Sequence, residues 1–201
     1  MNKSQIDIYL IKFIFFVLSV FIIIFSSGCD GNMLVNSSNN NQSAKEAIAM
    51  KLQSNAFKAN DLIPAQYTCD GKNISPPLLW DEIPKETQSI ALIVDDPDAP
   101  GRTFVHWVIY DIPNTIREFP ENISAVKTLP NGGVQGKNDF GNFGYGGPCP
   151  PSGTHRYFFK LYALDKSLSL AAGATKNQIL AAMEGHVLAT AELIGRYKRQ
   201  S

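Results

Sequence analysis

Two aspartates and two histidines occupy positions where their side chains could do chemistry. Asp96 and Asp98 flank Pro97 directly after an apolar run, where carboxylates are held rigidly and partly removed from water. His106 lies inside a second apolar segment, and His155 begins a third. Imidazole and carboxylate groups that meet in a fold can bind an anion or hold a metal ion. These residues form the candidate site.

The ordinary interpretation of a single histidine in an apolar segment is a core residue hydrogen-bonded to the backbone. Neighbouring carboxylates make a functional role more plausible for His106 and His155. The third histidine, His186, has no such neighbours and lies in a segment with helical spacing. We interpret His186 as structural.

A metal-dependent hydrolase that uses Asp96, His106 and His155 is the enzymatic alternative. The spacing of these residues lacks the compactness of an H-x-x-x-H site on a helix. No nucleophile is evident, because Ser152 lies in a Pro-Ser-Gly sequence and not in a nucleophile elbow. The sequence therefore favours a protein without catalytic residues, metal ion or cofactor.

The elements that must position these residues read mainly as β-strands. Residues 89–94 (SIALIV), 104–112 (FVHWVIYDI) and 155–164 (HRYFFKLYAL) are rich in β-branched and aromatic side chains and predict buried strands. Frequent prolines between residues 63 and 113 favour strands and ordered loops over a helical bundle. Residues 132–153 hold eight of the 15 glycines, which is typical of a functional loop.

One helix is predicted near the C-terminus. Thr175 and Gln178 have the spacing of a capping box. The apolar residues that follow recur at helical spacing: Ile179, Met183, Val187, Ala191 and Ile194. The pattern predicts an amphipathic helix that packs on the sheet, has Gly185 as its weak point and ends in a basic tail at residues 196–199.

The N-terminal segment predicts export from the cytoplasm. Residues 1–28 carry early lysines followed by an apolar run, and the small residues before Cys29 resemble the lipobox of bacterial lipoproteins. We expect residues 1–28 to be a lipoprotein signal peptide, Cys29 to be lipidated, and residues 29–45 to form a flexible Asn/Ser-rich tether before a domain at 46–201. An uncleaved helical anchor and ordinary secretion are the alternatives. All three place the domain outside the cytoplasm, and the lipoprotein is expected in the cell envelope, anchored to a membrane and facing the periplasm or the exterior.

The overall charge limits the class of partner. The chain of 201 residues has 18 basic and 18 acidic residues and a formal net charge of zero. A protein that follows a run of phosphates needs a surplus of positive charge. We therefore expect no nucleic-acid partner, and any anion must be bound in a local pocket.

Four motifs carry a family resemblance. Residues 96–100 (DPDAP), 104–107 (FVHW), 144–153 (GYGGPCPPSG) and 155–157 (HRY) resemble the signature of the phosphatidylethanolamine-binding protein family. They are most similar to its bacterial branch, the Raf kinase inhibitor-like proteins. The resemblance extends from about residue 57 to residue 197. It implies a β-sandwich with a C-terminal amphipathic helix and one or two short helices.

The resemblance also implies a small pocket for an anion such as phosphate or a phospholipid head group. In this pocket Asp96 would accept an imidazole N–H and raise the histidine pKa so that cation character is retained near neutrality. His106 and His155 would donate N–H groups to the anion, for which neutral rings would suffice, and the prolines would form a wall. Which of Pro148, Pro150 and Pro151 line the pocket is left open. The predicted ligand-binding residues are Asp96, Asp98, His106, Pro150, Pro151, His155 and Tyr157.

Two roles follow from this resemblance. The first is a non-catalytic binding protein for a small anion or phospholipid head group, attached to the membrane by its N-terminal lipid. The second is an interaction protein that inhibits a kinase or a protease through the same pocket. The sequence does not distinguish a small ligand from a protein partner.

Two cysteines remain when Cys29 is assigned to the lipid. Cys69 lies in a Cys-Asp-Gly turn, and Cys149 lies in the glycine- and proline-rich loop. In an oxidising compartment we expect them to form a disulfide that bridges two loops at the rim of the pocket. Two unpaired buried thiols are the alternative.

Overall fold

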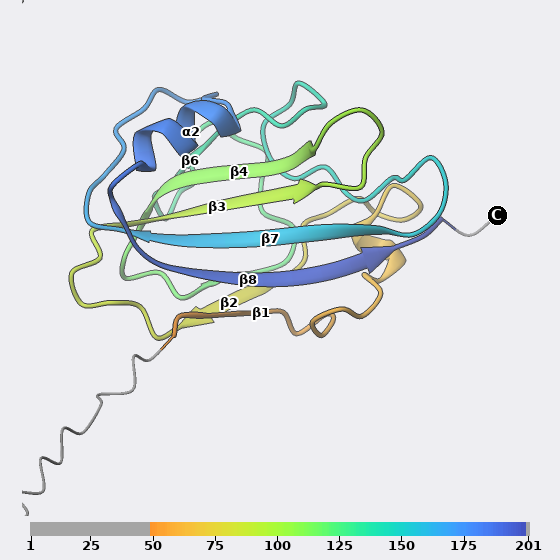
Figure 1. Ribbon diagram of the computed structural model, residues 1–201, viewed down its shortest axis with the longest axis horizontal. Helices are drawn as coiled ribbons and strands as arrows, with labels where there is room; N and C mark the ends of the chain where they lie inside the picture. The colour runs from red at the N-terminus through yellow and green to blue at the C-terminus, as the bar shows by residue number, and fades with distance from the viewer. Residues whose placement is uncertain (1–48, 200–201) are drawn as a thin grey trace, which may run out of the picture. The chain divides into compact units, whose positions relative to one another are not determined.

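The computed structural model describes residues 49–199 (Figure 1). The predicted signal peptide at 1–28, lipidation at Cys29 and the tether at 29–45 lie outside the described residues. The strands are β1 (Lys51–Gln53), β2 (Leu78–Asp81), β3 (Ser89–Asp96), β4 (Phe104–Pro113), β5 (Glu118–Phe119), β6 (Val134–Gln135), β7 (His155–Leu164) and β8 (Val187–Tyr197). The helices are the short 3-10 helix η1 (Ala65–Tyr67) and α2 (Lys176–Met183). No helix among the described residues is long and apolar enough to cross a membrane.

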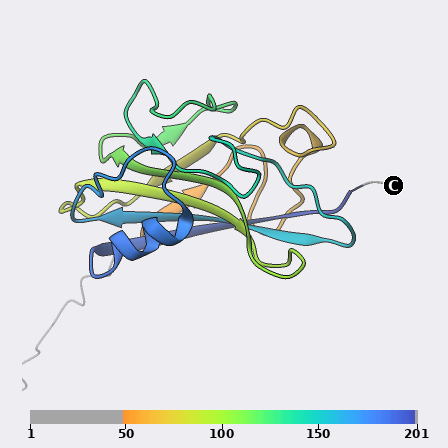
Figure 2. The same cartoon turned by 90° about the horizontal axis from the view of Figure 1, so that it is seen from above.

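The strands form two antiparallel sheets, which confirms the predicted mainly β fold. The larger sheet has the order β6-β4-β3-β7-β8 and the smaller sheet the order β1-β2-β5. Figure 2 shows α2 and the smaller sheet on opposite sides of the larger one. The larger sheet is therefore covered on both faces.

Strand β3, the central strand of the larger sheet, is almost continuously apolar because both of its faces are buried. Ile90, Leu92 and Val94 point into the core between the two sheets. Ala91 and Ile93, the residues between them, point to the other face and pack in the cluster that contains α2. Side chains alternate along a strand, so a strand buried on both faces needs apolar residues at every position.

The C-terminal helix prediction is correct at its start and wrong beyond Met183. The capping box is present, because the Thr175 side chain accepts from the backbone N–H of Gln178, and the Thr175 N–H lies 2.9 Å from Gln178 Oε1. Gly185 has a φ of 76°, which turns the chain, and residues 187–197 form β8 and not a helix.

The spacing that suggested a longer helix is also compatible with a strand. Residues four apart lie on the same side of a helix and on the same face of a strand. In β8 the buried residues are instead every second one, Ala191, Leu193, Gly195 and Tyr197. Strand β8 pairs with β7 along almost its whole length, from His155↔Tyr197 to Leu164↔Val187. Pairing with β7 thus overrides the local helical pattern.

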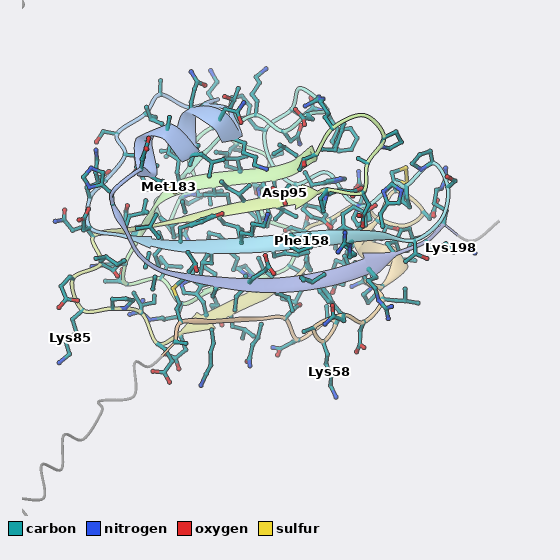
Figure 3. The ribbon with its side chains drawn as sticks, in the orientation of Figure 1. Lys58, Lys85, Asp95, Phe158, Met183 and Lys198 are labelled. Atoms are coloured by element: carbon teal, nitrogen blue, oxygen red, sulfur yellow. A yellow bond between two sulfur atoms is a disulfide. The ribbon has the colours of Figure 1, made fainter. Side chains whose placement is uncertain are left out.

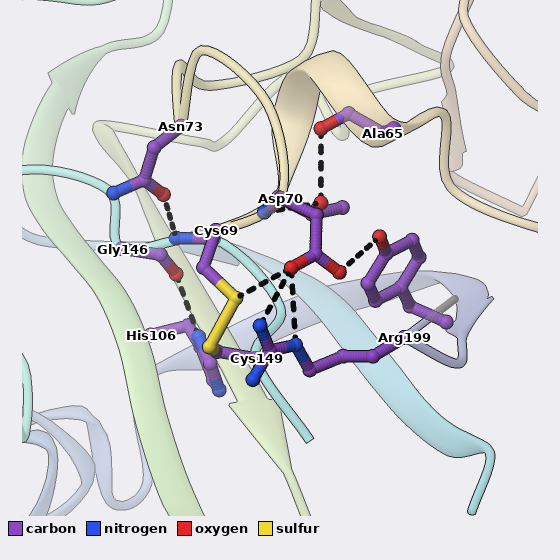
Figure 4. Close-up of a disulfide and its surroundings, with 11 residues drawn as sticks. Ala65, Cys69, Asp70, Asn73, His106, Gly146, Cys149 and Arg199 are labelled. Atoms are coloured by element: carbon purple, nitrogen blue, oxygen red, sulfur yellow. Dashed lines mark hydrogen bonds and ion pairs between the residues drawn. A yellow bond between two sulfur atoms is a disulfide. The ribbon is translucent and has the colours of Figure 1, made fainter. Parts of the chain in front are cut away.

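The glycine-rich loop at 132–153 contains β6 and packs closely on the segment around η1. A Cβ atom at Gly147 would lie only 2.6 Å from the carbonyl oxygen of Tyr67. The N–H of Gly147 donates to Asn73 Oδ1 at 2.7 Å. The structure joins Cys69 and Cys149 in a disulfide across the same contact (Figure 4). The loop is therefore attached to the rest of the domain immediately before Pro150 and Pro151.

The last two residues of β3 are both acidic, but their side chains have different partners on different sides of the larger sheet. Asp95, labelled in Figure 3, is fully buried, and its carboxylate accepts from Lys160 at 3.0 Å and from Lys176 at the start of α2. This ion pair connects the helix to the sheet. Asp96 follows a register shift between Val94 and Asp95, and it lines a cavity at the end of the strand.

Candidate functional site

A cavity of about 210 Å³ lies where β3 ends and β4 and β7 begin. Strand pairing brings these ends together, because Asp96 is opposite Phe104 on β4, and Asp95 is opposite Phe158 on β7. The lining residues are Asp96, Ala99, Pro100, Phe104, His106, Phe140, Cys149, Pro150, Pro151, His155 and Tyr157. The structure thus brings together all but one of the predicted ligand-binding residues.

Asp96 and His155 form a buried pair in this cavity. Asp96 Oδ2 lies 2.7 Å from His155 Nδ1, and the two residues are 3% and 7% exposed. The other carboxylate oxygen of Asp96 accepts from the backbone N–H of Asp98 at 2.8 Å. An ionised carboxylate only accepts hydrogen bonds, so His155 carries a hydrogen on Nδ1. Asp96 therefore orients the His155 ring and fixes its tautomer.

His106 is oriented by the backbone of the glycine-rich loop. Its Nδ1 lies 2.6 Å from the carbonyl oxygen of Gly146, an interaction that Figure 4 shows beside the disulfide. Burial lowers the pKa of His106, although the Gly146 carbonyl and the negative charge of Asp96 act in the opposite direction. His106 is therefore favoured as a neutral ring with its hydrogen on Nδ1.

This geometry corrects the expectation that neutral histidine rings suffice as donors to an anion. A neutral imidazole has one N–H, and in His106 and His155 that N–H is already directed to Gly146 and Asp96. The remaining nitrogen of a neutral ring is an acceptor. Either histidine can donate to an anion only after it takes up a proton.

Tyr157 can donate a hydrogen bond to an anion without first taking up a proton. Its hydroxyl is buried and makes no hydrogen bond of normal geometry within residues 49–199, although the Asp96 carboxylate and the Cys149 backbone lie near it. The pKa of Tyr157 is raised, first by burial and then by the negative charge of Asp96, so the hydroxyl keeps its hydrogen. The Tyr157 and His106 rings meet edge to face with their centroids 5.1 Å apart.

Asp98 is the predicted binding residue that the structure does not bring into the cavity. Its carboxylate binds Arg156 on β7, with 2.7 Å between Asp98 Oδ1 and Arg156 Nη2. The Arg156 side chain is the main cause that lowers the pKa of Asp98 from 3.8 to about 2. Asp98 thus fastens the loop after β3 to β7, next to the site.

Several wall residues were not predicted. Phe104 and Phe140 pack on each other at 4.8 Å between ring centroids, and each also contacts the His106 ring. Pro150 and Pro151 line the cavity, whereas Pro148 accepts a hydrogen bond from the N–H of Cys69. The DPDAP motif could have indicated Pro100, but nothing in the sequence indicates that Phe140 reaches His106.

The structure also bears on the other sequence alternatives. Within residues 49–199, no group of three or more His, Cys, Asp or Glu side chains is arranged to hold a metal ion. His186 lies in the turn before β8 and not within a helix, and its Nδ1 is 2.8 Å from Asp165 Oδ1. This second Asp–His pair does not line the cavity.

The fold and the site define a two-sheet β-protein with a small pocket of histidine, tyrosine and proline side chains at one end of the larger sheet. The sequence profile of the family described as phosphatidylethanolamine-binding protein matches residues 53–198. The chain belongs to the phosphatidylethanolamine-binding protein family. This confirms the family resemblance drawn from the four motifs.

Relatives and solved structures agree with this assignment. A UPF0098 protein of Methanothermobacter thermautotrophicus is 57% identical over 150 residues, which cover 75% of this chain and 99% of the relative. A phosphatidylethanolamine-binding protein homologue from Chlamydia trachomatis, CT736, matches with a TM-score of 0.71 and 42% identity over 76% of this chain and 99% of that chain. Escherichia coli YbcL, described as a member of the mammalian family, matches with a TM-score of 0.70 and 34% identity over 75% of this chain and 99% of its own.

Proposed function

We propose that this protein binds a small anionic group, such as phosphate or a phosphate-bearing head group, and does not transform it. The observation that carries the proposal is the buried Tyr157 hydroxyl, which makes no hydrogen bond of normal geometry within residues 49–199 and lies in a cavity shared with His106 and His155. A buried polar group without a hydrogen bond costs about 1–3 kcal/mol. A bound oxygen atom that accepts from Tyr157 removes this cost.

Charge and size are compatible with this ligand. When His155 is protonated, its pair with Asp96 is neutral overall, and its second nitrogen gains a hydrogen that can be donated. The cavity of about 210 Å³ is smaller than pockets for drug-sized ligands, which begin at roughly 300 Å³. It suits a head group better than a whole lipid.

Replacement of His106 by alanine tests the site. We expect His106→Ala to weaken the binding of phosphate and phosphoethanolamine by roughly tenfold to a hundredfold, the effect of losing one hydrogen bond to a charged group. Isothermal titration calorimetry of the full chain measures this change. His186→Ala is the control, because His186 also has a hydrogen-bond partner at Nδ1, here Asp165, but lies outside the cavity. Equal affinities of the wild type and His106→Ala would refute the assigned site.

We further propose that the domain is anchored to the outer side of a membrane through Cys29. The support is the sequence of residues 1–28 and its resemblance to a lipobox. We expect the mature protein to begin at a lipid-modified Cys29 and Cys29→Ser to retain residues 1–28. Mass spectrometry of both proteins after expression in a bacterium measures this difference. A wild-type protein with an intact Met1 or an unmodified Cys29 would contradict the proposal.

A further inference from the structure

The hydrogen atoms in the cavity can be assigned from the partners of each ring. The carbonyl oxygen of Gly146 only accepts, so the His106 nitrogen 2.6 Å away from it must carry a hydrogen. The same argument applies to His155 Nδ1 beside the carboxylate of Asp96. The tautomer of each ring is therefore fixed by its protein partner at Nδ1. In the neutral form each ring has an unprotonated Nε2, which accepts a hydrogen bond.

The surroundings of His106 favour this neutral form. The charged and titratable groups that act on it or face it are Asp95 and Asp96 from β3, Asp139 from the glycine-rich loop, and Tyr157 and His155 from β7. The three carboxylates raise the pKa of His106, but burial has the larger effect and lowers it. The apolar rings of Phe104 and Phe140 contribute to this burial. His106 is thus an acceptor within a cavity that is otherwise suited to an anion.

An anion that has no hydroxyl hydrogen to donate leaves Nε2 of His106 without a hydrogen bond. A phosphodiester monoanion has no P–OH group, so it can be bound through His106 only if the ring is first protonated. A phosphomonoester monoanion, or dihydrogen phosphate, still carries a P–OH. That hydroxyl can donate to Nε2 of His106 while the charged oxygens accept from Tyr157 and from protonated His155.

We propose that the cavity selects phosphate groups that carry a P–OH hydrogen, namely phosphomonoesters and inorganic phosphate, over phosphodiesters. The reason is that His106 accepts a hydrogen bond and does not donate one. The proposal rests on the proposed function and narrows its ligand class. Intact phospholipids carry a diester head group. They are therefore expected to be weaker ligands than the corresponding monoesters.

Two soluble ligands test this selection directly. Phosphoethanolamine and glycerophosphoethanolamine share the ethanolamine group and differ in whether the phosphate is a monoester or a diester. Isothermal titration calorimetry of the full chain at pH 6 should give an affinity for phosphoethanolamine about tenfold to a hundredfold higher, the effect of one satisfied buried acceptor. Raising the pH to 8 should weaken phosphoethanolamine binding, because the second ionisation of a phosphomonoester near pH 6 removes the P–OH hydrogen.

The affinity for inorganic phosphate is the third measurement, and it shows whether the ligand is a free phosphate ion or a phosphate ester. Affinity equal to that of phosphoethanolamine would identify the bare oxyanion as sufficient, and lower affinity would identify the ester as part of the ligand. Either result supports the selection as long as the diester is weaker than both.

A variant tests whether His106 causes the preference. His106→Phe keeps an aromatic ring but has no acceptor, so the affinity ratio of monoester to diester should fall close to one. His186→Phe, the matched control outside the cavity, should keep the wild-type ratio. Equal or higher affinity of wild-type protein for the diester would overturn the inference and leave the proposed function intact. Failure of phosphate and of both esters to bind would overturn the proposed function itself.

Discussion

Replacement of Asp96 by asparagine should weaken phosphate binding roughly 30-fold or more. Removal of one partner from a buried, hydrogen-bonded charge pair costs about 2–5 kcal/mol. In this protein the pair is Asp96 with His155, separated by 2.7 Å and almost fully buried. Asparagine carries no charge to balance a protonated His155, so protonation of the ring becomes less favourable. With the amide oxygen accepting from Nδ1–H, the neutral ring keeps an unprotonated Nε2, and the donor that His155 offers to the anion is lost.

The second Asp–His pair of the domain supplies the control. Asp165 and His186 are 2.8 Å apart but do not line the cavity. Asp165→Asn therefore makes the same chemical change outside the cavity. We expect the phosphate affinity of this variant to equal that of the wild type. Both affinities can be measured by calorimetry at pH 6. Tighter binding by Asp96→Asn would show that Asp96 acts only as a charge that repels the anion.

Removal of the Cys69–Cys149 disulfide should reduce the free energy of unfolding by about 2–5 kcal/mol. The bond joins residues 80 positions apart. A crosslink that closes so long a loop restricts the unfolded chain strongly, so its loss favours unfolding. The double variant Cys69→Ala/Cys149→Ala should also loosen the cavity wall, because Cys149 is part of the lining next to Pro150.

Urea denaturation followed by tryptophan fluorescence measures this loss, since Trp80 and Trp107 are buried in the core between the sheets. Wild-type protein treated with a reductant should unfold at the same urea concentration as the double variant. The reductant should not change the double variant, which provides the internal control. An unchanged midpoint for reduced wild-type protein would contradict the prediction.

The central strands could be predicted from the sequence because their pattern is local. Strand β3 is buried on both faces and therefore apolar at successive positions, and the predicted strand at 155–164 coincides with β7. The C-terminal segment was predicted less well. Its apolar residues Val187 and Ala191 are four positions apart, a spacing that fits one side of a helix and one face of a strand, and only pairing with β7 selects the strand.

Residue types and their order in the sequence determined the family, the fold class and most residues of the candidate site. Only the tertiary structure decided the hydrogen-bond partners. It assigned Asp96 to His155, 59 positions away, Gly146 to His106, 40 positions away, and Asp98 to Arg156 outside the cavity. These partners are brought together by strand pairing and loop packing, which no local pattern encodes. They determine which nitrogen of each ring carries a hydrogen, and the proposed selection among anions depends on this assignment.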